Sequence, residues 1–206
     1  MKSQSLSLFF RTGCFVAACL LTGLAVWKFA APSILTAASS NTRKIPIYSV
    51  ETDAPKVALS FDAAWGNEET GALLDILAKH NVHATFFMTG QWVECYPEDV
   101  KAIAAAGHDL GNHSQNHKEM SCLSASECAR EIQQVHDQVK ALTGIDMTLF
   151  RPPYGEYDDQ LIEVASGMGY HVIQWNVDSL DWKDYGAQDI VSRVLNHKNL
   201  CNGSII

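Results

Sequence analysis

From residue 57 onward the sequence alternates short apolar runs with amphipathic stretches, and this alternation constrains the fold more than any other feature. We expect strands at 57–61, 84–88, 108–110, 147–150 and 171–175, and the start of another at 203–206. We expect helices at 70–80, 97–106, 124–142, 158–168 and 188–197. Such a regular alternation predicts a parallel sheet with helices outside it, either open and doubly wound or closed as a barrel.

Local signals mark several of these helix ends. Pro97 suits the first turn of its helix, and Gly107 suits the exit. Ser124 and Glu127 have the spacing of a capping box, in which the side chain of each residue accepts from the backbone N–H of the other. Gly144 is placed to end that long helix.

The positions of polar side chains discriminate between an open sheet and a barrel. Asp62 ends the first expected strand, His113 follows the third, Arg151 ends the fourth, and Asp178 and Asp181 follow the fifth. In a barrel all carboxyl ends of the strands meet at one rim, whereas a doubly wound sheet spreads them apart. The sequence contains no glycine-rich phosphate loop of a nucleotide-binding sheet. We therefore expect an α/β fold, a distorted (β/α) TIM-like barrel.

An apolar leader precedes this domain. Lys2 and Arg11 are followed by an uncharged stretch at 12–27, which is typical of an export signal. We expect 1–38 to be a signal peptide or a membrane-anchoring leader helix, 39–54 a linker and 55–206 the functional domain. An ordinary buried helix is the remaining alternative for the leader. Positive residues before the apolar run favour an extracytoplasmic domain, anchored or secreted, whose contact with the membrane is made by the leader.

Charge and cysteine content restrict the function further. The formal net charge of -8 argues against a nucleic-acid partner, because phosphate recognition needs a basic surface, but it does not repel a neutral glycan. Four cysteines lie in the expected domain and could form bridges in an oxidising compartment: Cys95, Cys122, Cys128 and Cys201. The sequence does not rank their three possible pairings.

Two histidines, His113 and His117, lie four residues apart. Two imidazoles at this spacing can present nitrogens to one cation, although the same spacing also occurs in ordinary surface or packing pairs. Ser114 stands where a zincin protease would have glutamate, which excludes that class. The polar residues at the other strand ends favour a metal site.

Four stretches of the chain carry a resemblance to a known family. They are 60–62 (Ser-Phe-Asp), 113–117 (His-Ser-Gln-Asn-His), 151–155 (Arg-Pro-Pro-Tyr-Gly) and 175–182 (Trp-Asn-Val-Asp-Ser-Leu-Asp-Trp). In order and spacing they resemble four of the five motifs of the polysaccharide deacetylases, the NodB homology family. The stretch 62–66 further resembles a sporulation-associated branch. The resemblance implies a barrel of NodB homology type that covers the chain from Pro55 onward.

The implied activity is a metal-dependent hydrolase that removes N-acetyl groups from amino sugars of cell-wall polysaccharide, either peptidoglycan or a chitin-like glycan. By resemblance, His113 and His117 bind a divalent metal, for which zinc is expected, and Asp62 takes a proton from the attacking water. Arg151 keeps Asp62 charged and aimed, since a guanidinium beside a carboxylate favours its ionised form.

Three further roles follow from the same resemblance. The backbone N–H of Tyr154 faces the oxyanion, and Trp182 forms a wall of the sugar pocket. Asp181 orients the histidine that acts as general acid. Trp65 and Trp175, by contrast, are expected in the core or the pocket wall rather than as recognition residues, as are Phe86 and Phe87.

Two departures from the family pattern leave a second reading open. Ala63 stands where the family usually has a second aspartate, its third metal ligand, and a methyl group cannot coordinate a metal. Asp62 itself, or a residue of 67–69, could supply the missing ligand. The last family motif, with the general-acid histidine, is absent from this chain, so the domain is expected to be truncated at its C-terminus. The alternative is a catalytically impaired glycan-binding pseudoenzyme. A transporter is disfavoured, because a single apolar segment forms no pathway.

Overall fold

The computed structural model describes residues 43–206, and residues 44–206 form one compact unit. The expected leader at 1–38 lies outside the described residues. Within the part of the chain that is described, no helix combines the length and the apolar character needed to cross a membrane.

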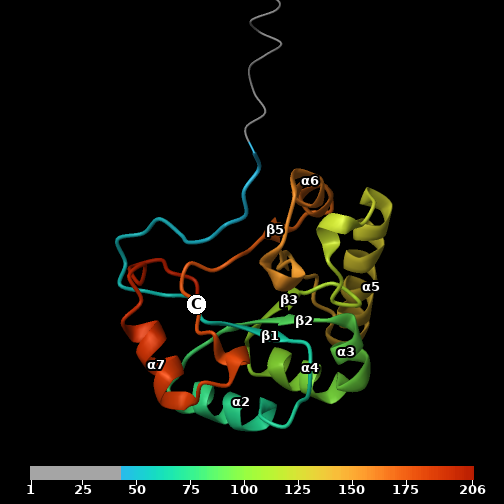
Figure 1. Cartoon of the computed structure of the whole chain (residues 1–206). Coiled ribbons are helices and arrows are strands. Elements are labelled where there is room, and N and C mark those ends of the chain that lie inside the picture. Colours follow the sequence, from blue (N-terminus) through green and yellow to red (C-terminus); the bar gives the residue numbers. More distant parts are fainter. Residues whose placement is uncertain (1–42) are drawn as a thin grey trace, which may run out of the picture. The chain divides into compact units, whose positions relative to one another are not determined.

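Five short strands form a parallel sheet in chain order (Figure 1). They are β1 (Ser60–Ala63), β2 (Thr85–Met88), β3 (Asp109–Asn112), β4 (Leu149–Phe150) and β5 (His171–Val172). Each strand pairs in parallel with the next, so that all five carboxyl ends point the same way. The five expected strands are confirmed, with ends that differ by a few residues.

The ring of strands continues beyond β1 and β5 through isolated bridges. Ile47 pairs in parallel with Ile173, and Ala58 pairs in parallel with Ile205. Ser49 bridges to Ser204, and the N–H of residue 50 donates to the carbonyl of residue 203 at 2.9 Å. The expected strand start at 203–206 is therefore confirmed. The segment 47–50 lies within the range expected to be a linker, but its backbone is hydrogen-bonded into the fold and joins the two edges of the sheet.

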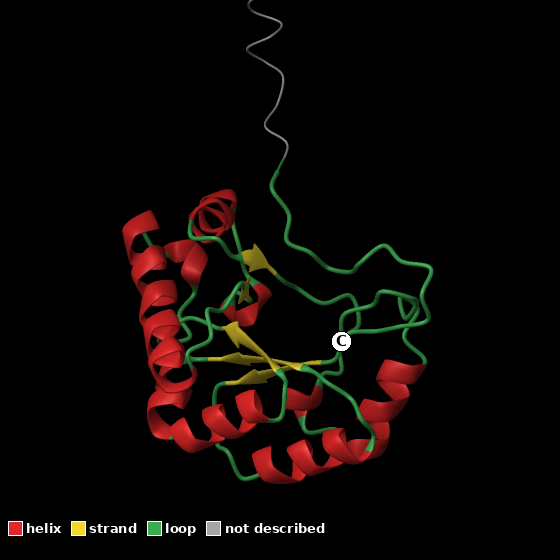
Figure 2. Cartoon of the chain, turned by 180° about the vertical axis from the view of Figure 1, so that it is seen from behind, coloured by secondary structure: helices red, strands yellow, loops and turns green. Residues whose placement is uncertain are grey.

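Six α-helices among the described residues connect and cover the strands (Figure 2). They are α2 (Thr70–Lys79), α3 (Gly90–Cys95), α4 (Pro97–Ala105), α5 (Ala125–Thr143), α6 (Asp159–Gly167) and α7 (Ala187–Leu195). The capping box of Ser124 and Glu127 is present, and Gly144 ends α5 with a φ of 76°. Helix α3 was not predicted; it has only six residues and begins where the Thr89 side chain accepts from the N–H of Trp92.

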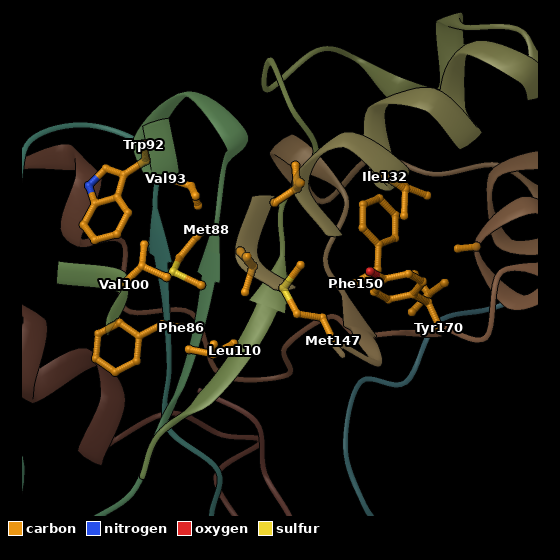
Figure 3. Packing of buried hydrophobic residues seen from close by; sticks show 14 of the residues in the cluster. Phe86, Met88, Trp92, Val93, Val100, Leu110, Ile132, Met147, Phe150 and Tyr170 are labelled. Atoms are coloured by element: carbon orange, nitrogen blue, oxygen red, sulfur yellow. The ribbon is translucent and has the colours of Figure 1, made fainter. Parts of the chain in front are cut away.

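The core has two parts, because successive strand residues point to opposite faces. Phe86 packs in the larger cluster between the strands and the helices, where Figure 3 shows it near Leu110 and Val100. Phe87 points to the inside of the ring with Ile173 and Ile205. Both phenylalanines are buried, as expected. The four cysteines of the described region are free thiols.

A small cavity lies inside the ring. Its volume is about 100 Å³, and it is lined by Ala58, Ser60, Thr85, Phe87, Leu149, Arg151, Ile173 and Ile205. Apart from the polar groups of Ser60, Thr85 and Arg151, this lining is apolar, so the ring is a packed interior and not a channel. The polar residues of interest lie at the carboxyl ends of its strands.

Candidate active site

Three of the predicted residues meet at the carboxyl end of the sheet. Asp62 lies in β1, His113 follows β3 directly, and Arg151 follows β4 directly. Arg151 Nη1 donates to Asp62 Oδ1 at 2.8 Å. His113 Nε2 lies 3.7 Å from Asp62 Oδ2. Parallel strands in chain order thus bring together side chains that are far apart in the sequence.

The buried guanidinium of Arg151 fixes the carboxylate of Asp62. Its Nη2 donates to the hydroxyl of Ser60 at 2.8 Å, while its Nη1 holds Asp62. Its central carbon also lies 4.1 Å from the centroid of the Phe87 ring. The planar guanidinium therefore has several fixed neighbours, and a charge-assisted hydrogen bond holds Asp62 Oδ1. The second oxygen of Asp62 is left on the side of His113.

The buried imidazole of His113 is oriented by a backbone carbonyl. His113 Nδ1 lies 2.7 Å from the carbonyl oxygen of Arg151. A carbonyl can only accept, so we assign the proton to Nδ1, which leaves the lone pair of Nε2 facing Asp62. Burial lowers the pKa of His113, although the nearby Asp62 partly opposes this effect. At neutral pH His113 is therefore a neutral imidazole whose Nε2 lone pair is available to a ligand.

His117 completes the pair. Its ring centroid lies 4.9 Å from that of His113. Its Nδ1 is buried and has no hydrogen-bond partner among residues 43–206. Burial and the neighbouring His113 both lower the pKa of His117. Two neutral imidazoles therefore lie side by side, and one of them carries an unsatisfied nitrogen.

The backbone around the pair is strained. Ser114, His117 and Tyr154 have positive φ angles of 65°, 50° and 60°. This left-handed region costs a residue with a side chain about 1–3 kcal/mol and is tolerated where the surroundings enforce it. Here the Asn112 side chain accepts from the N–H of Ser114, and the Ser114 hydroxyl accepts from the N–H of His117. These bonds hold both histidines in a fixed loop.

Glu131 of α5 also holds this loop, and sequence reasoning missed it. Its carboxylate is buried and accepts from the N–H and the side-chain amide of Asn116 and from the ammonium of Lys118, each at 2.8 Å. Burial raises the pKa of Glu131, but the hydrogen bonds from Lys118 and Asn116 outweigh it and leave the pKa below its ordinary value. The available signal was its position, since Glu131 falls within the buried stripe of α5 beside Cys128 and Ile132.

A catalytic zinc usually has three protein ligands, and the side chains of this site could supply two of them. His113 and His117 offer nitrogens, with the orphaned Nδ1 of His117 as the observation in favour. Over residues 43–206, no group of three or more His, Cys, Asp or Glu side chains is arranged to hold a metal ion. Asn67 is not a substitute ligand, because its amide donates to Asp99 at 2.7 Å. The position of the usual third ligand carries the methyl group of Ala63.

Aromatic side chains surround His117. The ring centroid of Tyr154 lies 4.6 Å from that of His117, and the ring centroid of Trp65 lies 5.1 Å from it. Both pairs are edge-on. Trp65 was expected in the core or the pocket wall; it is 80% exposed, so it is not in the core, and a place in the pocket wall stays a prediction. It lies at the surface beside the histidine pair.

Two predicted residues are not joined to this cluster. Asp181 and Trp182 lie in a short 3-10 turn, η3 (Asp181–Lys183), after β5. The carboxylate of Asp181 accepts from the hydroxyl of Ser179 and the N–H of Trp182, and the indole of Trp182 contacts Lys183. These contacts are local to the turn and do not connect it with Asp62 or the histidines in the described part of the chain.

Comparison with known proteins identifies the family. Residues 49–173 match the sequence model of the family described as polysaccharide deacetylase. The chain is 38% identical over 148 residues to the peptidoglycan-N-acetylmuramic acid deacetylase PdaC of Bacillus subtilis, covering 72% of this chain and 31% of that protein. It is 37% identical over 151 residues to a peptidoglycan-N-acetylglucosamine deacetylase of Bacillus cereus, covering 73% of this chain and 54% of that protein. The chain thus spans about half the length of these relatives or less.

Solved structures agree on the fold. A pseudoenzyme of carbohydrate esterase family 4 from Bacillus anthracis superposes with a TM-score of 0.75 at 34% identity, covering 78% of this chain and 57% of that chain. A mutant of the same protein is described as having restored enzymatic activity, and it matches with the same TM-score of 0.75. The folded unit thus resembles a pseudoenzyme and a mutant of it in which activity is restored.

Proposed function

This chain belongs to the polysaccharide deacetylase family, and we propose that it removes N-acetyl groups from amino sugars of cell-wall glycan. The observation that carries the proposal is the cluster of Asp62, Arg151 and His113 at the carboxyl end of the sheet. Arg151 Nη1 donates to Asp62 Oδ1 at 2.8 Å, and His113 Nε2 lies 3.7 Å from Asp62 Oδ2. Named homologues are hydrolases of peptidoglycan N-acetyl groups, which supports the same class of reaction. Because these homologues act on the cell wall, we also propose that the chain works outside the cytoplasm, with 1–38 as its signal peptide or anchor.

Amide hydrolysis needs an attacking water, a base and stabilisation of the developing oxyanion. A divalent metal, with zinc expected, would be held by His113 and His117 and would supply Lewis acidity at the acetamide carbonyl. Asp62 is suited to accept the proton of the water through Oδ2, because Arg151 occupies Oδ1. Arg151 also keeps the carboxylate in one orientation, so that the base is aimed before substrate binds.

The remaining residues are assigned to the substrate. The N–H of Tyr154 makes no hydrogen bond to another described residue and lies in a strained turn beside His117, which suits a donor to the oxyanion. Trp182, 75% exposed, would line the sugar pocket. Asp181, in the same turn, would orient a general-acid histidine.

A second candidate function is glycan binding without hydrolysis. It is favoured by Ala63, which leaves the two imidazoles without the third protein ligand of a catalytic zinc. The similarity to a family 4 pseudoenzyme supports the same reading. With only two ligands, the metal would be held more weakly and its charge would be less well neutralised.

Acetate release separates the two candidates. The full chain is incubated with chitotetraose or peptidoglycan at a fixed zinc concentration, and free acetate is measured beside glycan binding by calorimetry. Acetate release that is abolished in Asp62→Asn supports the deacetylase. Saturable binding without acetate release supports the pseudoenzyme. Absence of both would overturn the assignment of this site to glycan chemistry.

A further inference from the structure

Trp65 presents an exposed indole next to the histidine pair. It is 80% exposed, and its ring lies 5.1 Å from that of His117. Tyr154, 62% exposed, lies 4.6 Å from the same imidazole. The two aromatic rings come from different loops, one after β1 and the other after β4. Two solvent-facing aromatic rings thus lie close to His117.

The loop that carries Trp65 is held rigidly on both sides of it. The carbonyl of Ala63 accepts from the N–H of Thr89 at 3.0 Å. The carbonyl of Gly66 accepts from the indole N–H of Trp92 at 2.5 Å. One residue further on, the side chain of Asn67 bonds to Asp99 of α4. The backbone is therefore fixed while the Trp65 side chain remains in solvent, and burial does not explain its position.

A fixed and exposed aromatic ring suits one face of a sugar. A pyranose ring presents C–H groups on its faces and hydroxyl groups on its edge, so a flat aromatic ring covers the former and leaves the latter in water. Tryptophan combines a large apolar surface with a polar N–H, and it is enriched where binding energy is concentrated. Because the loop is already ordered, little conformational entropy is lost when a ligand stacks on it.

We propose that Trp65 is a glycan-contacting residue, which stacks on a pyranose ring of an N-acetylated glycan bound beside His117. The inference rests on the proposed glycan binding at this site, but not on hydrolysis. It gives the loop after β1 a role in choosing the substrate, next to Asp62 of β1 itself. It also accounts for a tryptophan that the fold does not bury.

Calorimetric titration of the full chain with chitotetraose tests the inference. Trp65→Leu, which keeps apolar bulk but removes the ring, is expected to weaken binding about tenfold. Trp65→Phe keeps a ring and is expected to stay within about threefold of the parent affinity. Ile76→Ala is the matched control, because Ile76 is an apolar residue of α2 that is 56% exposed, and its removal should leave the affinity unchanged.

Two outcomes would overturn the inference. One is unchanged chitotetraose affinity in Trp65→Leu, or no binding by the parent chain. The other is a parallel loss of zinc affinity in Trp65→Leu, since the indole would then support His117 and not the sugar. Failure of this inference can be distinguished from failure of the proposed hydrolysis. If Trp65→Leu loses binding tenfold and the parent chain releases no acetate, the role of Trp65 is upheld. The same result rejects the deacetylase activity.

Discussion

Arg151 Nη1 lies 2.8 Å from Asp62 Oδ1, although the two residues are 89 positions apart in the chain. The contact exists because β1 and β4 run in the same direction, so that residues at their carboxyl ends reach the same rim. The hydroxyl of Ser60, on the same strand as Asp62, accepts a hydrogen bond from the second guanidinium nitrogen, Nη2. The Arg151 side chain, which follows β4, thus fixes the Asp62 carboxylate and the Ser60 hydroxyl of β1.

Replacing Arg151 by lysine tests this alignment. Lysine keeps the charge, but its single ammonium cannot reproduce the fork that binds Asp62 and Ser60 or the contact with Phe87. We expect the free energy of unfolding to fall by about 1–3 kcal/mol in urea denaturation. Acetate release, where the parent shows it, should fall about 100-fold, because the base is no longer aimed. Arg130→Lys, at an exposed position of α5, is the control; equal behaviour of the two variants would contradict the role of Arg151.

The histidine pair is tested by zinc binding. His113→Ala and His117→Ala should each weaken zinc affinity by at least about tenfold in calorimetry, because each removes one of the two proposed nitrogen ligands. His171→Ala, at an exposed position of β5, should bind zinc like the parent. Parent-like zinc affinity in either of the first two variants would remove that residue from the metal site.

Zinc binding should also depend on pH in a defined direction. Protons compete with the metal for an imidazole. Because burial lowers the pKa of His113 and His117 below the ordinary value of 6.5, the zinc affinity of the folded chain should hold as the pH falls to that value and weaken only below it. An affinity that already declines between pH 8 and 7 would contradict neutral imidazoles in the folded state.

Ala63→Asp tests whether the missing third ligand limits the site. A carboxylate at this position would complete the usual set of three protein ligands, and we expect zinc affinity to rise by about tenfold or more. Acetate release should appear or increase with it. Ala64→Asp adds the same charge one position later and serves as the control. If both variants bind zinc equally well, the gain comes from net charge and not from coordination.

Glu131→Gln tests the support of the histidine loop. The variant loses charge-assisted bonds to Asn116 and Lys118, and we expect a loss of about 1–3 kcal/mol in the free energy of unfolding at pH 7. The folded pKa of Glu131 is lowered, so its contribution is fully present above the ordinary value of 4.5 and disappears as the pH falls through the folded pKa. Urea denaturation of both proteins at decreasing pH should therefore show their stabilities converging. A constant difference at all pH values would mean that the carboxylate charge is not involved.

Strands and helices were predictable where periodicity was long enough. Helix α5 shows apolar residues at helical spacing and begins with its capping box, and the sequence contains both signals. Helix α3 escaped prediction, because six residues are too few to show a period. The bridges of segment 47–50 could not be anticipated either, since their partners at 172–174 and 203–204 are distant and only backbone groups take part.

The sequence by itself determined the order of strands and helices and the resemblance to polysaccharide deacetylases, and it singled out Asp62, Arg151, His113 and His117 as candidate site residues. These depend on local periodicity and on residue types at short spacing, which are properties of the chain before it folds. Only the tertiary structure decided that Glu131 holds the histidine loop, that Trp65 faces solvent beside His117 and that Asp181 and Trp182 make only local contacts. The first two are relations between residues of different elements, which packing around the sheet fixes and the neighbours of a residue in the sequence do not. The third is a contact that packing did not form.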